Sequence, residues 1–487
     1  MNCASLPETR REYIPVGSTP ASMRARVSDR EAQSLSLELT GQQWVNRVIL
    51  LILLSLLSLC VSVQAADDAL PEPLTLAYVL QQVRGSHPVL ALAQSDIAVA
   101  QALGTQVDSE QDWDIYLEGY GEWPRYASIY STTGAEYDNS KLSLIAERRL
   151  YDFGYSQAQR ERSDLLVKGE EQQYHLVYQG HLIQLITQYT DILLADMNFR
   201  TLDEVMAVAY VRYERAQEAH RMGQISDIVL LEKESIYQQA MLQRVIAQAQ
   251  QKNTRVALAE AMGRPNSLAA SLRDPGFGFF AQRPPQLDEL YYEASQSNPG
   301  LLAIDYKLEA MQAQLRAIRR SSNPRLDLEL TANKYAGLVA YDKKWTAGLV
   351  MNVPLMKRGQ DARLVAAHAS VSRLQAEKKN GIMKVRAALL SLWQQLNTLS
   401  AQSRALIIEQ DFRDLDLDKN RSLYEMEVQA DLGDSMIRLA EVRMKLALNR
   451  YQQALTWARL AWYTGDKKYM PVIEGFSFQN RMTKGGG

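Results

Sequence analysis

The stretch NPRLDLELTANKYAG, residues 323–337, decides the fold class because its apolar and polar side chains alternate. In an extended chain the two sets lie on opposite faces: Leu326, Leu328 and Leu330 against Asp327, Glu329 and Thr331. A period of two over about nine residues is typical of a β-strand with one apolar face and one wet face. We therefore predict a strand over 325–335.

Three further segments have the character of strands. The segment 344–355 alternates almost as regularly, with Trp345 and Leu349 on its apolar side. The segments 113–123 and 141–151 alternate less strictly. Each of the four is roughly ten residues long, which is the length of a transmembrane β-strand.

The rest of the chain favours long helices. No proline occurs from Arg125 to Arg264, nor from Leu355 to Met470, and proline breaks the interior of a helix. A helix over 155–221 would be about 100 Å long, far longer than a globular domain needs. In the second proline-free run, steps of three and four indicate coiled-coil packing. The residues are Ile382, Val385, Leu389, Leu392, Leu396, Leu399, Ser403 and Leu406.

The sequence contains an internal duplication. The motif Leu76-x10-His87-Pro88 returns as Leu287-x10-Asn298-Pro299. Each half has a helical segment (74–110 and 287–320), then two strands separated by a polar loop, then a very long helical stretch. We assign the chain to a first repeat (66–272), a linker rich in helix breakers (273–286), a second repeat (287–470) and a C-terminal tail (471–487).

Residues 1–65 have the features of an export leader with an extended N-terminal region. Their apolar run, 48–63, is shorter than the roughly 20 residues of a membrane-spanning helix and leads to a small-residue cleavage motif at Ala65. Lipidation of Cys60 is the alternative, which the large residue before it disfavours. Cleavage after Ala65 would remove both Cys3 and Cys60, and with them any disulfide or thiolate metal site.

Four half-apolar strands restrict the architecture of an exported chain. In lipid an open sheet leaves its edge N–H and C=O groups unpaired, and spanning barrels have about eight strands or more. A chain that supplies four membrane strands therefore has to oligomerise, and a trimer would supply about twelve. The alternative is a soluble periplasmic coiled-coil scaffold or adaptor whose strands pack on a helical core. The leader, the duplication and the coiled coil together favour the barrel.

Several motifs occur in a characteristic order along the chain. They are RRLYDFG, RYERAQEAHRMGQISDIVLLEKES and ALAEAMGRP in the first half, then NVPLMKRG and YEMEVQADLGDSMIRLAEVR in the second. In this order and duplication, residues 74–465 resemble the TolC family of outer-membrane efflux proteins. The resemblance implies a mostly α fold with membrane β: four strands per chain joining a trimeric, twelve-stranded barrel on a long coiled-coil tunnel.

The resemblance also implies a location and partners. The barrel would lie in the outer membrane of a Gram-negative bacterium, and the tunnel would extend into the periplasm. The homotrimer would be a passive exit duct of a tripartite efflux or type I secretion system. Its partners would be outer-membrane lipid, a periplasmic adaptor (membrane fusion protein) and an inner-membrane transporter of the RND or ABC type.

In the resembling family, the tips of the long helices close the periplasmic end of the tunnel. Asp431 and Asp434 correspond to the second tip, and at a spacing of three they share a helix face. Around a threefold axis their carboxylates would form a ring that narrows the pore. The alternative is that Asp431 only caps a helix. At the first tip the acidic candidate is Asp227.

Three glycines and several strand residues also have predicted roles. Gly223 is expected to end a helix in left-handed geometry, while Gly154 and Gly359 are expected to let the chain bend from barrel into tunnel. The predicted lipid-facing residues are Leu326, Leu328, Leu330, Trp345 and Leu349. The predicted lumen residues are Asp327, Glu329 and Thr331.

Composition argues against other classes of function. The chain has 54 Lys and Arg against 56 Asp and Glu, with no basic block, which argues against nucleic acid as a partner. Its five histidines have no metal-ligand spacing, and no catalytic constellation can be recognised. We therefore expect no enzyme activity, no metal and no cofactor. The substrate class, whether drugs, metals or secreted protein, stays open on the sequence.

Overall fold

The computed structural model describes residues 70–83, 87–121, 140–277, 284–335, 344–426 and 431–470. These residues belong to one compact unit. The expectations for the leader, for Cys60 and for the C-terminal tail fall outside them.

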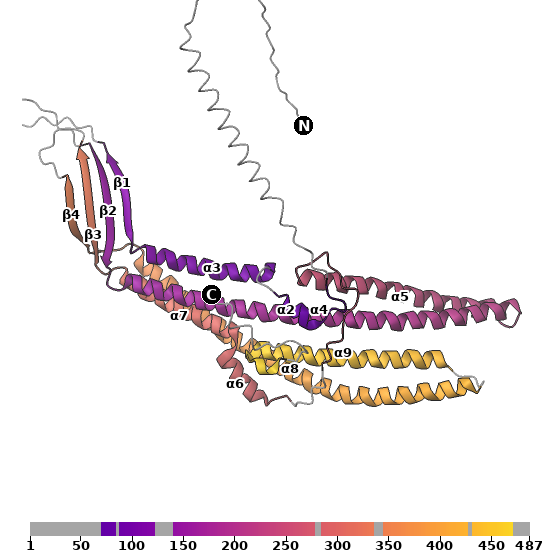
Figure 1. Cartoon of the computed structure of the whole chain (residues 1–487). Helices are drawn as coiled ribbons and strands as arrows, with labels where there is room; N and C mark the ends of the chain where they lie inside the picture. Colours follow the sequence, from indigo (N-terminus) through magenta and orange to yellow (C-terminus); the bar gives the residue numbers. More distant parts are fainter. Residues whose placement is uncertain are drawn as a thin grey trace, which may run out of the picture. The chain divides into compact units, whose positions relative to one another are not determined.

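The described elements occur twice in the same order (Figure 1). The first series is α2 (Leu76–Gln81), α3 (Pro88–Ser109), β1 (Trp113–Tyr120), β2 (Lys141–Tyr151), α4 (Tyr155–Arg221) and α5 (Asp227–Ala261). The second is α6 (Leu287–Ser297), α7 (Pro299–Arg320), β3 (Arg325–Tyr335), β4 (Trp345–Asn352), α8 (Gln360–Glu425) and α9 (Leu432–Thr464). A short 3-10 helix, η1 (Lys467–Tyr469), follows.

Each of the two shorter helical segments is divided, where the sequence predicted one continuous segment. The second helix of each pair begins with Pro88 or Pro299, because proline is accepted in the first helical turn but breaks a helix interior. Asn298 caps α7 by accepting a hydrogen bond from the N–H of Leu301 at 2.9 Å, and His87 occupies the same position before α3. The repeated motif therefore marks a helix start.

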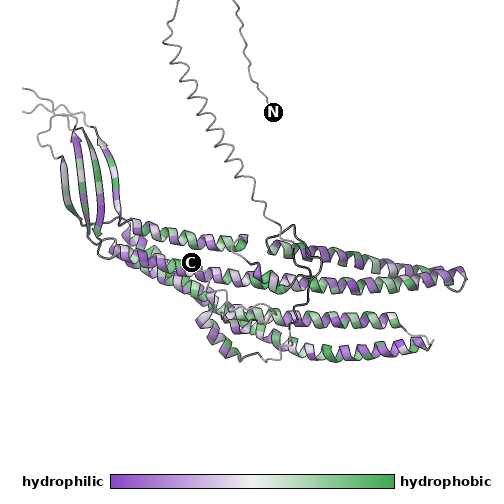
Figure 2. Ribbon diagram, viewed as in Figure 1, coloured by the Kyte–Doolittle hydropathy of each residue, from purple (hydrophilic) through white to green (hydrophobic). Residues whose placement is uncertain are grey.

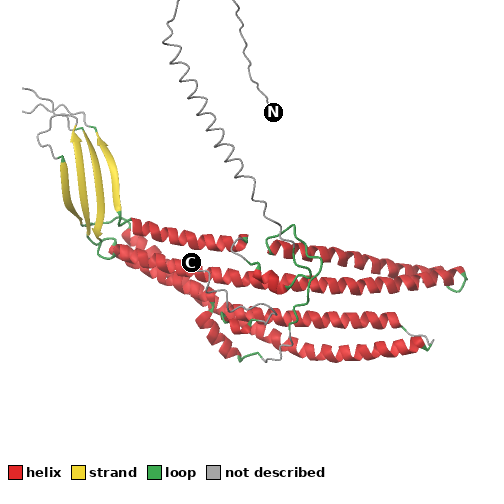
Figure 3. Ribbon diagram, in the orientation of Figure 1, coloured by secondary structure: helices red, strands yellow, loops and turns green. Residues whose placement is uncertain are grey.

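The long helices pack as the heptad pattern predicts. The helix α4 spans Tyr155–Arg221 and contacts α5, α7 and α9, while α8 contacts α9 (Figure 3). Most of the predicted heptad positions are buried, namely Leu389, Leu392, Leu396, Leu399, Ser403 and Leu406. The two outermost positions, Ile382 and Val385, are half-buried.

A buried core joins the two halves of the chain. The fully buried Tyr189 of α4 shares its hydroxyl proton between the carbonyl oxygens of Leu74 and Arg273, at 2.8 and 2.5 Å. Tyr451 of α9 lies in the same core and donates to Asp274 Oδ2 at 3.2 Å. The linker is thus fixed between the first and the last long helices.

The four strands form one antiparallel sheet in the order β1-β2-β3-β4. The strand β3 has the predicted bounds, whereas β4 ends at Asn352, earlier than predicted. Pro354 follows soon after, and proline has no N–H to donate to a strand ladder. The outer strands β1 and β4 each pair on one side within the described chain.

Candidate functional site

The strand register gathers apolar side chains on one face of the sheet. Hydrophobic and hydrophilic residues both occur along the strands (Figure 2). Directly paired residues of antiparallel strands share a face. The face contains Trp113, Ile115, Leu117 and Gly119 of β1; Leu142, Leu144, Ala146 and Arg148 of β2; Leu326, Leu328, Leu330, Ala332 and Lys334 of β3; and Trp345, Ala347, Leu349 and Met351 of β4. Its charged members, Arg148 and Lys334, lie near opposite ends. All the residues predicted to face lipid are on this face.

The opposite face of the sheet is polar. Asp114 of β1 pairs with Glu147 of β2, which pairs with Glu329 of β3, so a row of three carboxylates crosses the sheet. Tyr116 donates to Glu147 Oε1 at 2.9 Å, and Thr331 donates to Glu329 Oε1 at 3.0 Å. The three residues predicted to face the lumen lie on this polar face.

Burial distinguishes the two faces. On β2, Ser143 and Ile145 of the polar face are 1% and 8% exposed, whereas Leu142 and Leu144 of the apolar face are 48% and 49% exposed. On β2 the apolar face is therefore more exposed than the opposite face, the reverse of a strand that packs its apolar face on a soluble core. A barrel built from such sheets encloses polar groups and presents apolar groups to its surroundings.

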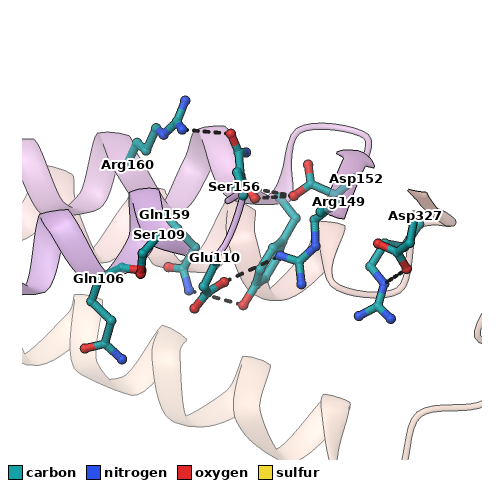
Figure 4. A network of polar contacts seen from close by, with 12 residues as sticks. Gln106, Ser109, Glu110, Arg149, Asp152, Ser156, Gln159, Arg160 and Asp327 are labelled. Atoms are coloured by element: carbon teal, nitrogen blue, oxygen red, sulfur yellow. Dashed lines mark hydrogen bonds and ion pairs between the residues drawn. The ribbon is translucent and has the colours of Figure 1, made fainter. Parts of the chain in front are cut away.

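A polar network ties the first half of the sheet to the helices (Figure 4). Arg149 of β2 forms an ion pair with Glu110 at 3.5 Å, and Arg160 of α4 forms one with Asp108 of α3 at 2.5 Å. Asp152 accepts a hydrogen bond from the N–H of Ser156 at 3.0 Å and so satisfies the first turn of α4. The network fixes how the chain leaves β2 and enters the long helix.

An arginine of the first half binds both acidic residues of the second tip. Arg212 Nη2 of α4 lies 2.8 Å from Asp431 Oδ1 and 2.8 Å from Asp434 Oδ1. Asp431 also caps α9 by accepting a hydrogen bond from the N–H of Asp434 at 3.3 Å. The structure thus brings the two predicted carboxylates together and adds a partner that the sequence analysis missed. A single basic residue within a long polar helix gives no sequence signal that it contacts a distant acidic pair.

The contacts in this cluster stabilise the charged forms of Asp431 and Arg212. Partial burial by itself would raise the pKa of the Asp431 carboxyl, but the N–H of Asp434 and the Arg212 guanidinium hold it below its usual range. Desolvation lowers the pKa of Arg212, and its bonds to Asp434 and Asp431 outweigh that effect and raise it. Asp431 and Arg212 therefore both stay charged at neutral pH.

The first tip has a separate acidic contact. Asp227, the first residue of α5, has a side chain that is 86% exposed and lies 2.6 Å from His220 Nε2. His220 is eight residues beyond Arg212 on α4, or about 12 Å along the helix. Within one chain the structure therefore does not place Asp227 in the cluster formed by Asp431 and Asp434.

The three glycines occupy turns with positive φ. Gly223 has a φ of 73° and donates its N–H to the carbonyl of His220 at 2.9 Å, just after α4. Gly154 and Gly359, with φ of 86° and 75°, directly precede α4 and α8. At Gly154 a Cβ would also lie 2.9 Å from Arg320 Nη1. A larger residue there would therefore have both an unfavourable positive φ and a close contact that the Arg320 side chain would have to move to relieve.

The described residues offer neither a cluster of metal ligands nor a membrane-spanning helix. In the described ranges, no group of three or more His, Cys, Asp or Glu side chains could hold a metal ion. Among the helices of the same ranges, none combines the length and the apolar character needed to cross a membrane.

Comparison with known proteins gives a match at the level of structure. No protein-family model matches the sequence, and no curated protein matches it. The CmeC outer membrane channel of Campylobacter jejuni matches with a TM-score of 0.65 and 14% identity, over 84% of this chain and 88% of that one. The outer membrane protein VceC of Vibrio cholerae matches with a TM-score of 0.61 and 15% identity, over 80% of this chain and 96% of that one.

The MtrE outer membrane channel of Neisseria gonorrhoeae, in its open state, also matches. Its TM-score is 0.62 and its identity is 14%, over 80% of this chain and 88% of that one. The chain therefore has the fold of these outer-membrane channels, with long helices and a four-stranded antiparallel sheet. The predicted fold class is confirmed.

Proposed function

We propose that this protein is an outer-membrane exit duct that conducts substrates passively from an inner-membrane pump to the outside. The observation that carries the proposal is the sheet, whose register produces one continuous apolar face and one polar face. Such a sheet suits a barrel wall between lipid and water. The shared fold with outer-membrane channels supports the same assignment.

The sheet edges favour assembly of several copies. In lipid, the free edges of β1 and β4 would leave backbone groups unpaired. Pairing β4 of one chain with β1 of the next removes both edges, and three copies would close a barrel of about twelve strands. The homotrimer, with its barrel in the outer membrane and its helices in the periplasm, is part of this proposal.

The duct needs partners because nothing in the sequence points to an energy-converting or catalytic site. The resemblance to the TolC family supports a periplasmic adaptor and an inner-membrane transporter of the RND or ABC type. We accordingly assign the protein no enzyme activity of its own. Efflux and type I secretion both fit this architecture.

The Arg212 cluster suits a latch for the periplasmic end. Arg212 lies on the α4–α5 hairpin, and its two carboxylate partners lie at the start of α9 in the other hairpin. A partly exposed ion pair of this kind contributes about 1 kcal/mol. Breaking it in every copy would therefore favour separation of the two hairpins by a modest amount, as an opening step requires.

Conductance measurements test both the duct and the latch. We expect the purified protein to form ion-conducting channels in planar bilayers, and Arg212→Gln to increase the fraction of time they are open. Arg443→Gln is the matched control, because Arg443 pairs with Asp414 at 3.1 Å within the α8–α9 hairpin. An equal effect of both substitutions would contradict the proposed latch. Recovery of the protein only from the soluble periplasm would contradict the proposed duct.

A further inference from the structure

The turn between β4 and α8 exposes two large apolar side chains. Leu355 is 96% exposed and Met356 is 88% exposed. Exposed apolar side chains of this size cost free energy in water, at roughly 25 cal/mol per Å². Adjacent residues exposed to this degree point to a surface that another phase or molecule covers.

The turn continues the apolar face of the sheet. On β4 the apolar face holds Trp345, Ala347, Leu349 and Met351, and the same alternation runs on through Val353 to Leu355. Val353 is 45% exposed. If the apolar face contacts lipid, as proposed above, Leu355 therefore lies at the helix-proximal boundary of that contact.

An aromatic side chain of β2 is turned towards the same boundary by a bulge. Arg149 pairs with Asp327, but the next pair is Tyr151 with Leu326, so the register shifts by one residue. Bulges of this kind redirect a side chain to the other face. Tyr151 thereby joins the apolar face, 57% exposed, with its ring 4.7 Å from that of Phe153. Aromatic residues are enriched where a barrel leaves the membrane.

Basic residues accompany these apolar ones. Lys357 and Arg358 follow directly, both exposed, and Lys357 Nζ donates to the carbonyl of Ser321 at 3.1 Å. Asp361 and Arg363 come next, so the turn and the first helical residues keep a net positive charge. Arg148, on the apolar face near the same end, lies 5.9 Å from the ring of Trp113. Basic residues beside apolar and aromatic ones suit a leaflet of anionic headgroups.

The equivalent turn of the first half is held at its glycine by an arginine, a contact that the second turn lacks. There, Asp152 is bound by Ser156, and the carbonyl of Gly154 accepts a hydrogen bond from Arg320 Nη1 at 3.0 Å. In the second half the corresponding glycine, Gly359, has open space around it. The two turns occupy the same place in the duplicated element order. Leu150 and Phe153 of the first turn are 48% and 46% exposed, whereas Leu355 and Met356 of the second are 96% and 88% exposed.

We propose that the turn 353–358 is a phospholipid-docking surface on the periplasmic leaflet of the outer membrane. Leu355 and Met356 enter the acyl boundary, and the Arg358 guanidinium binds the phosphate of an anionic phospholipid. The inference rests on the proposed function, because it needs the barrel in the outer membrane. It adds a named anchor and a headgroup preference to the general contact of a barrel with lipid.

Spin labelling tests the depth of this turn. Both cysteines, Cys3 and Cys60, lie in the predicted leader, so with Cys3 and Cys60 replaced by serine, Met356→Cys gives a single labelling site whether or not the leader is cleaved. In proteoliposomes, a nitroxide at residue 356 should collide more often with oxygen than with a water-soluble nickel chelate. Arg373→Cys is the control: residue 373 is exposed on α8, fifteen residues past Arg358 or about 22 Å along the helix, and its label should show the reverse.

Lipid retention tests the headgroup preference. The wild type, reconstituted in mixed phosphatidylcholine and phosphatidylglycerol, should retain phosphatidylglycerol preferentially when examined by native mass spectrometry. Arg358→Gln should lower that preference about fivefold, as expected for one basic residue at a membrane surface. Arg373→Gln should leave it unchanged.

Each other outcome overturns the inference. A label at residue 356 as accessible to nickel as the one at 373 would place the turn in water. A label shielded from both reagents and broadened by a second spin would mean that another copy of the chain covers the turn. An unchanged lipid preference in Arg358→Gln would contradict the proposed contact between Arg358 and the lipid headgroup. The conductance of the wild type in the same bilayers is the control for the proposed function. If the wild type conducts ions but the turn fails these tests, only the docking surface is wrong; if the wild type does not insert, both proposals fail.

Discussion

The imidazole rings of His181 of α4 and His87 before α3 are in contact, tilted by 34° to each other. Their ring centroids are 4.2 Å apart, and His181 is 4% exposed. Burial, and secondly the neighbouring His87, lower the pKa of His181 below its usual value of 6.5. Glu260 of α5 and Arg264 line the same cavity of about 640 Å³. At neutral pH His181 is therefore favoured in its uncharged form.

The buried His181 should make the free energy of unfolding depend on pH. Because the pKa of His181 is lower in the folded than in the unfolded chain, the unfolded state takes up a proton first as the pH falls. We expect the unfolding temperature in detergent to fall below about pH 6.5, and the His181→Gln variant to show a flatter dependence. His368→Gln, at an exposed position of α8, is the control and should keep the wild-type slope. Equal slopes for the wild type and His181→Gln would exclude this origin.

At the residue scale, the sequence predicted carboxylates but not their partner. The spacing of Asp431 and Asp434 placed them on one helix face, and they do share a contact. Arg212 lies 219 residues from Asp431 in the sequence, so its approach depends on how α4 packs against α9. No local pattern encodes that packing. The pore ring itself depends on neighbouring copies and stays a prediction.

At the element scale, strands and long helices could be predicted because their periodicities are sustained. The alternation over β3 and the proline-free length of α4 are local properties, and both elements have the predicted bounds. The division before Pro88 and Pro299 was not predicted, because His87-Pro88 and Asn298-Pro299 were interpreted only as parts of the repeated motif and not as helix starts. The bulge at Tyr151 was also missed, since it arises from pairing with β3 rather than from the sequence of β2.

The orientation of β3 can be tested by a pair of neighbouring substitutions. Leu328→Arg places a second positive charge on the apolar face, directly opposite Arg148, and should hinder assembly. The cost of a charge on the lipid face falls from about 2–4 kcal/mol at the membrane midplane to about 0–1 kcal/mol near the interface, and this level lies near the helix-proximal end of the sheet. Glu329→Ala removes a carboxylate that faces Glu147 on the polar face and should be tolerated. The amount of heat-modifiable oligomer in the outer membrane measures both. Equal tolerance of the two substitutions would contradict the orientation.

At the scale of the whole molecule, the linker holds the two halves together through Tyr189. Replacing Tyr189 by Phe leaves the carbonyls of Leu74 and Arg273 without its hydroxyl proton. The Leu74 carbonyl keeps the N–H of Arg273 at 2.9 Å, so we expect the free energy of unfolding to fall by about 0.5–1.5 kcal/mol, the net contribution of a hydrogen bond. Tyr210→Phe is the control, because Tyr210 is 45% exposed. Thermal unfolding of both variants in the same detergent measures the difference.

The carboxylate row gives the assembled duct an expected charge preference. Asp114, Glu147 and Glu329 lie at one level of the polar face. One level nearer the helices, Asp327 is compensated by Arg325 at 2.6 Å and is paired across the strands with Arg149. The negative potential of the proposed lumen therefore concentrates at the row, and three copies would close it into a ring that favours cations.

Reversal potentials across a potassium chloride gradient measure this preference. Glu147→Gln and Glu329→Gln should each lower the ratio of cation to anion permeability, because each removes one charge per copy from a confined ring. Glu289→Gln, at an exposed position of α6, removes the same charge away from the sheet and should leave the ratio unchanged. A shift of equal size in all three variants would trace the preference to net charge. No shift in the two sheet variants would place the polar face outside the conducting path.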